Sequence, residues 1–122
     1  MNRFGFDEAR WESAKIEAKQ TLSECAKQGQ MIPYSEFVGR IRSITLQAHD
    51  PRLAHFLEEI SMEENSAGRG MLTALVVHKR GDQRPGPGFF DLAERLGHNT
   101  ADIDRCWIEE VNKVFASWTG SQ

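Results

Sequence analysis

GMLTALVVHKRGDQRPGPGFF, residues 70–90, is the stretch of sequence that decides the fold. It is the one part of the chain whose pattern is typical of a strand, and it holds two of the four prolines. Residues 71–79 are rich in aliphatic and β-branched side chains and end in charge, which predicts a partly buried strand. Residues 80–88 then predict a turn. Whether a second strand returns stays open, because Pro85 and Pro87 lack the N–H donors of a central ladder and favour an edge strand or an irregular arm.

The rest of the chain predicts helices, because apolar residues recur at every third or fourth position. Asp50 before Pro51 is a helix start, Thr100 is a candidate cap for the last helix, and Gly97 is a candidate helix end. The expected helices cover residues 7–28, 35–44, 51–64, 89–96 and 101–118. The fold class expected is therefore α+β and mostly helical, with about five helices, one short strand or hairpin, and a single core.

Size and composition limit the class of protein. The 122 residues match one domain, which we expect to span residues 1–122. No apolar run approaches the length of a membrane helix, and residues 1–10 lack the apolar core of a signal peptide, so we expect a cytoplasmic protein without a membrane partner. Cys25 and Cys106 lie far apart in predicted helices, which favours reduced core thiols over a disulfide or a metal pair.

No motif in the sequence indicates a reaction. The four histidines lack the spacing of a helical metal pair, so neither a metal nor another cofactor is expected. In residues 84–88 the prolines remove N–H groups that a phosphate-binding loop would use, although the helix start that follows, beside basic residues, leaves an anion site open. No nucleophile motif is present, and this favours a protein that is not an enzyme and has no catalytic residue.

Two motifs carry a resemblance to a known family: IPYSEF, residues 32–37, and LTALVVHKRGDQRPGPGFF, residues 72–90. Together they resemble an uncharacterised bacterial domain family, some of whose members are attached to restriction-type endonucleases. Its pattern is a Thr-Tyr-x-Glu-Leu-Ala helix start, then a Leu-Thr-x-Leu-Val-Val-x-Lys strand and Pro-Gly-x-Gly-Phe. The matching residues are Tyr34, Glu36, Leu72, Thr73, Leu75, Val76, Val77, Lys79, Pro85, Gly86, Gly88 and Phe89. The match covers roughly residues 32–96, and departs from the family where Pro33 and Phe37 replace threonine and leucine.

More distantly, the layout is similar to winged-helix domains, such as that of the alkylguanine alkyltransferases. Their Pro-Cys-His-Arg active site is absent from this sequence, so no alkyl transfer is implied. The resemblance implies that the third helix would read DNA and that residues 80–88 would form the wing.

Two functions of a non-enzymatic binding module follow. The first is contact with nucleic acid, in particular duplex DNA, through a basic arm at residues 79–84 and a nearby arginine. Its candidate residues are Arg69, Lys79, Arg80 and Arg84. The alternative is binding of a basic protein, as in a protein that neutralises a toxin or a nuclease, through the acidic end of the third helix. Its candidate residues are Glu58, Glu59, Glu63 and Glu64.

A third hypothesis is a small hydrolase-like enzyme whose site combines carboxylates with a histidine. It would require the fold to gather His78, Glu63 and Glu64 in one pocket.

Overall fold

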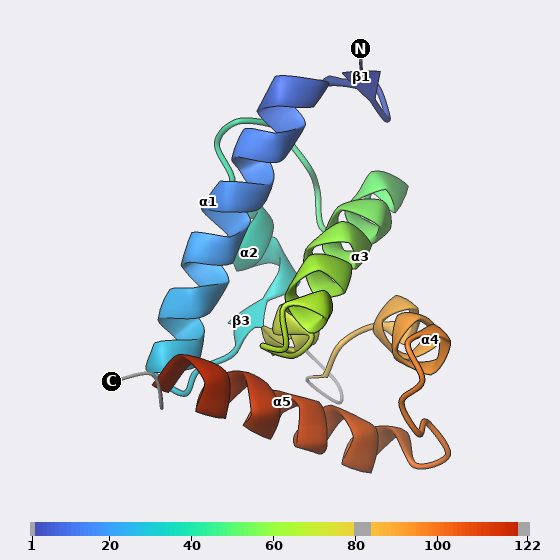
Figure 1. Ribbon diagram of the computed structural model, residues 1–122. Coiled ribbons are helices and arrows are strands. Elements are labelled where there is room, and N and C mark those ends of the chain that lie inside the picture. The colour runs from blue at the N-terminus through green and yellow to red at the C-terminus, as the bar shows by residue number, and fades with distance from the viewer. Residues whose placement is uncertain (1, 80–83, 120–122) are drawn as a thin grey trace.

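Helices make up most of the structure (Figure 1). The computed structural model describes residues 2–79 and 84–119. In order along the chain, the elements are β1 (Asn2–Arg3), β2 (Phe6–Asp7), α1 (Glu8–Lys27), β3 (Ile32–Pro33), α2 (Tyr34–Gly39), α3 (Pro51–Ser66), the 3-10 helix η1 (Leu72–Leu75), β4 (Val76–Val77), α4 (Pro87–Arg95) and α5 (Ile103–Thr119).

The long helices surround a buried central segment. Figure 1 shows α1 beside α3, α4 on the far side of α3, and α5 running across the end of α1. Residues 71–77 are buried in the middle, where η1 contacts α1, α3 and α5. The buried apolar side chains form one cluster around this segment.

The expected strand over residues 71–79 is wrong for most of its length. Its first half is the 3-10 turn η1, in which the Ala74 N–H donates to the Met71 carbonyl at 2.9 Å, and only Val76–Val77 pairs as a strand. A strand needs a partner along its whole length, but β3 offers only two residues, in a parallel register. Elsewhere helices surround the segment, so its backbone groups bond locally or to side chains, as when Trp107 Nε1 donates to the Ala74 carbonyl.

The helix expected at residues 35–44 is also shorter than predicted. It ends at Gly39, and residues 41–46 run without regular structure although Ile41 and Ile44 remain buried. Glu17 of α1 explains the boundary, because its carboxylate accepts hydrogen bonds from the Arg42 and Ser43 N–H groups at 2.9 and 3.0 Å. These bonds lower the pKa of Glu17 and hold the loop against α1.

The other helix boundaries follow local signals. Asp7 and Asp50 cap α1 and α3 through their carboxylates, as the sequence predicts for the Asp50-Pro51 pair. Asp102, not Thr100, caps α5, because the Asp102 carboxylate accepts from the Arg105 N–H at 3.1 Å. Gly97 follows α4 with φ +91°, a conformation that favours glycine.

The fold class is confirmed: the described residues contain five α-helices and two short two-stranded sheets around one core. The antiparallel β1–β2 hairpin at the N-terminus was not predicted. Among residues 84–88 no strand returns to β4, and β4 pairs in parallel with β3, so a winged-helix hairpin is not seen in the described part of the chain. No helix in that part is both long and apolar enough to cross a lipid bilayer.

Candidate functional site

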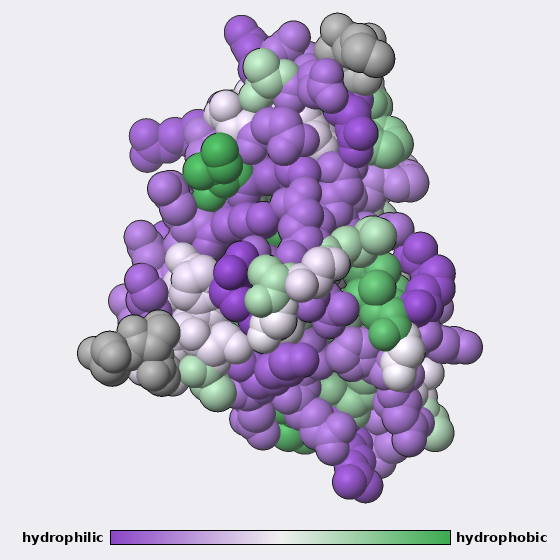
Figure 2. Space-filling view, in the orientation of Figure 1, coloured by the Kyte–Doolittle hydropathy of each residue, from purple (hydrophilic) through white to green (hydrophobic). Residues whose placement is uncertain are grey.

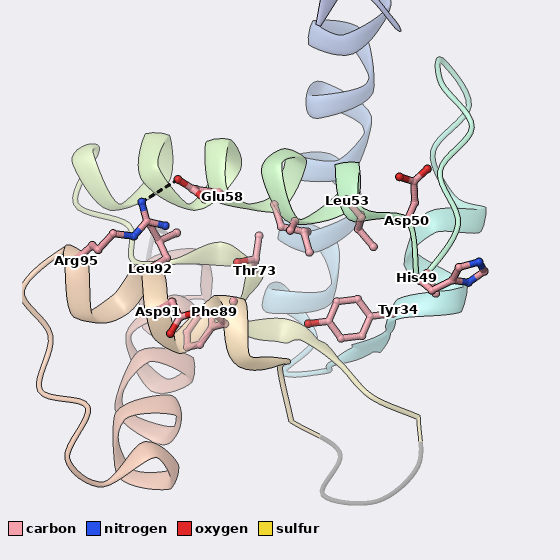
Figure 3. Close-up of a pocket in the computed structure, with 14 residues that line it drawn as sticks. Tyr34, His49, Asp50, Leu53, Glu58, Thr73, Phe89, Asp91, Leu92 and Arg95 are labelled. Carbon is pink, nitrogen blue, oxygen red and sulfur yellow. Dashed lines mark hydrogen bonds and ion pairs between the residues drawn. The ribbon is translucent and has the colours of Figure 1, made fainter. Parts of the chain in front are cut away.

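A pocket of about 330 Å³ lies between α3 and α4 (Figure 3). Residues of α3, of α4 and of the loop before α3 form apolar walls, which are Ala48, Leu53, Ala54, Leu57, Phe89 and Leu92. The amphipathic pattern of α4 turns Phe89 and Leu92 toward α3, and the Asp50 cap fixes where α3 begins. We call this site the α3–α4 pocket. Its volume falls within the range of small binding pockets.

Two hydroxyl groups lie at the floor of the α3–α4 pocket. Figure 3 shows Thr73 and the hydroxyl of Tyr34 pointing into the space between the two helices. The Tyr34 oxygen accepts a hydrogen bond from the Gly86 N–H at 2.9 Å, and burial raises the pKa of Tyr34 although this bond opposes the shift. Thr73 shares a hydrogen bond with the hydroxyl of Ser61, which is fully buried on α3. Tyr34 therefore keeps its proton at neutral pH and donates it to no described residue.

Charged side chains surround the mouth of the pocket, and most of them are acidic. At one end Arg95 Nη1 lies 3.1 Å from Glu58 Oε1, and Asp91 is exposed beside this ion pair. At the other end Asp50 is held by Arg52 at 2.7 Å, and Figure 3 shows the ring of His49 turned away from the pocket. With Arg52 counted, three carboxylates face two guanidinium groups, and Asp91 is left without an ion pair among the described residues, so the mouth has a net negative charge that favours a cation.

The opposite face of α3 is closed by an ion network with α1. Lys15, only 4% exposed, places Nζ 2.6 Å from Glu63 and 3.2 Å from Glu59, and Trp11 Nε1 donates to Glu59 at 3.0 Å. Lys19 pairs with Glu63 at 2.7 Å. We call Trp11, Lys15, Lys19, Glu59 and Glu63 the α1–α3 seam.

Hydrogen bonds in the seam decide the protonation of its charged groups. Burial alone would lower the pKa of Lys15, but hydrogen bonds to Glu63 and Glu59 outweigh it and raise the pKa. Burial alone would raise the pKa values of Glu59 and Glu63, but bonds from Trp11, Arg3 and the lysines lower them. All these groups are charged at neutral pH.

The four glutamates of the predicted acidic surface do not form one patch. Glu58 is at the pocket mouth, whereas Glu59 and Glu63 belong to the α1–α3 seam. Glu64 is buried and accepts two hydrogen bonds from Arg69, at 2.8 and 2.7 Å. His78 packs instead against the ring of Tyr34, so the structure does not gather His78, Glu63 and Glu64 in one pocket.

The predicted basic residues also separate. Arg69 pairs with Glu64 and lies over the ring of Trp118, near the end of α5. Arg84 pairs with Asp104 at the start of α5, about 21 Å away along a helix of this length. Lys79 is exposed, and Arg80 lies outside the described residues.

Sequence reasoning missed most of the pocket. Thr73 is the single polar residue in the buried run of residues 71–77, and Tyr34 is the only tyrosine in the chain. Asp91 and Arg95 lie one turn apart on α4, a spacing that marks one face of a helix. These signals show polar groups on otherwise apolar elements, but not that the elements meet.

Among the described residues, metal and thiol chemistry finds no support in the pocket lining. In residues 2–79 and 84–119, no three His, Cys, Asp or Glu side chains are grouped so that they could hold a metal ion. Cys25 and Cys106 are free thiols outside the pocket lining, and burial raises the pKa of both.

Comparison of the chain with protein-family models, with curated proteins and with solved structures finds no match. The resemblance to the family with the Tyr-x-Glu helix start therefore stays a prediction.

Proposed function

We propose that the protein is a non-enzymatic binding module that recognises a basic protein partner through the α3–α4 pocket. The observation that carries this proposal is the combination of apolar walls with an acidic mouth. An apolar side chain of the partner fills the pocket, and a neighbouring lysine or arginine meets Asp91 and Glu58. In this proposal Glu58 contacts the basic partner, whereas Glu59, Glu63 and Glu64 stabilise the fold through their ion pairs.

The surface around the pocket favours a polypeptide over a small molecule. Met62 is 43% exposed and lies one turn along α3 from Glu58, so apolar surface extends beyond the pocket mouth. Figure 2 shows a mostly hydrophilic face on which a hydrophobic patch lies at the junction of α3 and α4. Such patches with polar rims are typical of protein interaction sites.

The pocket lining supports binding more than catalysis. The Tyr34 oxygen accepts from the Gly86 N–H and the Thr73 hydroxyl is bonded to Ser61, and neither hydroxyl has a hydrogen bond to a histidine or carboxylate base among the described residues. Glu58 is paired with Arg95, and Asp50 is held by Arg52, whose hydrogen bonds lower the pKa of Asp50. This arrangement suits recognition of charge.

Selection from a random peptide library against the immobilised protein tests the proposal. We expect the enriched peptides to share an apolar or aromatic residue beside lysine or arginine. Ala54→Phe, which fills the pocket from an exposed position of α3, should abolish their binding, and Asp91→Lys should weaken it. Ala116→Phe and Glu24→Lys are the matched controls, because both positions are exposed and outside the pocket. Enrichment of no peptide, or of peptides insensitive to Ala54→Phe, would overturn the proposal.

A second candidate function is contact with nucleic acid through the arm at residues 79–84. It is supported by Lys79, which is exposed, and by the hydrogen bond from the His78 N–H to the Arg84 carbonyl at 3.1 Å, which brings the two ends of the arm together. The ion pair of Arg84 with Asp104 and the acidic pocket mouth count against it. The test is a gel-shift titration with duplex DNA at low salt. Binding that weakens in Arg80→Ala and Arg84→Ala would support it, and no retardation would exclude it.

A further inference from the structure

We infer that the residue the partner inserts into the α3–α4 pocket is a tyrosine with a lysine or arginine beside it. This inference rests on the proposed function and adds the chemistry of the anchor. It starts from the floor of the pocket, where Tyr34 and Thr73 present hydroxyl groups below apolar walls.

The hydrogen-bond pattern at the floor requires a polar atom from the ligand. The Tyr34 oxygen accepts from the Gly86 N–H, and its O–H donor has no partner among the described residues while the hydroxyl lies at the pocket. Thr73 and Ser61 share one hydrogen bond, and the Ser61 oxygen also accepts from the Thr73 N–H at 3.4 Å. When a ligand excludes water from the floor, the Tyr34 donor needs an acceptor in its place.

Tyrosine meets the demands of both the floor and the walls. Its ring supplies a large apolar body for the space between Leu53, Leu57 and Phe89, and its hydroxyl accepts from Tyr34 at the tip. Phenylalanine and leucine have no acceptor, and tryptophan has only an N–H donor, so each would leave the Tyr34 O–H without a partner. A carboxylate tip would have to pass the acidic mouth.

The mouth selects the residue next to the anchor. Asp91 is exposed and makes no ion pair among the described residues, while Glu58 shares its charge with Arg95. A lysine or arginine beside the anchoring tyrosine would therefore meet Asp91 first. The order from floor to mouth, hydroxyl then ring then cation, is the pattern we assign to the partner.

Titration with short soluble peptides tests the inference. The probe contains one tyrosine flanked by arginines in a glycine-serine background, and the comparison peptides carry phenylalanine, tryptophan or leucine at that position. Binding is followed by amide chemical shifts in NMR spectra of the full chain. We expect the tyrosine peptide to bind roughly tenfold more tightly than the phenylalanine peptide. The shifts should concentrate at residues of the pocket.

A double-mutant cycle connects that preference to the floor. In Tyr34→Phe the donor is lost, so the tyrosine and phenylalanine peptides should bind alike; a thermal unfolding transition would check that the variant folds. If the variant does not fold, the comparison of the tyrosine and phenylalanine peptides on the wild-type protein still tests the inference. Phenylalanine binding as tightly as tyrosine to the wild type, or a preference that survives Tyr34→Phe, would overturn the inference.

The two proposals fail differently. If phenylalanine and leucine peptides bind as well as tyrosine and all lose binding in Ala54→Phe, the binding function stands and the tyrosine assignment falls. If none of the peptides shifts the pocket resonances at millimolar concentration, the proposed function itself falls.

Discussion

The two faces of α3 use similar residues for different purposes. In the α1–α3 seam, Lys15 is buried with hydrogen bonds to Glu59 and Glu63, and Trp11 also donates to Glu59. In the α3–α4 pocket, the Tyr34 hydroxyl faces open space and donates to no described residue. Glu58 and Glu59 are neighbours in the sequence, yet one borders the pocket and the other closes the seam.

This difference separates stabilising polar groups from recognising ones. A buried charge is tolerated only when its partners are complete, as they are for Lys15. A polar group that lines a cavity with hydrogen-bonding capacity left over contributes little to the fold and remains available to a ligand. Mutations should therefore cost stability in the seam and affinity in the pocket.

Lys15→Met should have the largest effect on stability. The substitution leaves Glu59 and Glu63 without their shared cation, so we expect a loss of about 2–3 kcal/mol in the free energy of unfolding. This expected loss is smaller than the loss for a fully buried ion pair, because the Glu63 side chain is 45% exposed. Urea unfolding of the variant measures it. Lys27→Met, at an exposed position of the same helix, is the control and should change stability by less than about 0.5 kcal/mol. Equal stability of the two variants would contradict the role given to the seam.

The seam should also make the free energy of unfolding depend on pH in the acidic range. The pKa values of Glu59 and Glu63 are lowered from their ordinary value of 4.5, so their stabilisation is present above that pH and is lost as the pH falls through the lower folded values. The pKa of Lys15 is raised from 10.5, so its own contribution is lost only at alkaline pH. We expect the wild type to lose about 1 kcal/mol more than Lys15→Met between pH 7 and pH 3.

Urea unfolding at several pH values measures the two curves. Acid-sensitive groups outside the seam, such as Glu17 and Asp50, contribute equally to both proteins, so the difference between the curves reports the seam. Parallel curves would show that Lys15 does not set the protonation of the glutamates.

Local signals in the sequence predict much of the fold. The apolar periodicity of α1 and α5, the Asp50-Pro51 start of α3 and the glycine after α4 act within one or two helical turns. The predictions that are wrong, the length of α2 and the strand over residues 71–79, concern segments whose structure depends on contacts distant in the sequence. Glu17 ends α2 from another helix, and residues 72–75 form a 3-10 helix packed among α1, α3 and α5 where the sequence predicts a strand.

The pocket is harder to predict than the fold for the same reason. The sequence predicts Glu58 as a partner-binding residue because it is acidic. Nothing local distinguishes it from Glu59, which lies on the opposite face of α3. Tyr34 and Thr73 are 39 positions apart in the sequence and line one pocket because β3, directly before Tyr34, pairs with β4, which follows η1. That pairing spans two residues and leaves too weak a pattern to read from the sequence.

Ala54→Phe should change stability little, in contrast to Lys15→Met. Ala54 is exposed at the pocket wall, so a larger side chain enters open space and the free energy of unfolding should stay within about 0.5 kcal/mol of the wild type. Urea unfolding beside the control Ala116→Phe measures this. A loss above that range, with the control unchanged, would mean that the pocket is part of the packed core.

Arg95→Ala should have the smallest effect on stability and should alter affinity in the opposite direction from Asp91→Lys. Its ion pair with Glu58 joins two side chains at the surface, where such pairs contribute a few tenths of a kcal/mol. Removing the guanidinium leaves the mouth more acidic, so the arginine-flanked tyrosine peptide should bind roughly two- to threefold more tightly at low salt. The matched control is Arg105→Ala, another exposed arginine in a single ion pair, on α5, which should leave the affinity unchanged. Weaker binding by Arg95→Ala would mean that the arginine itself contacts the peptide, and that the mouth recognises more than positive charge.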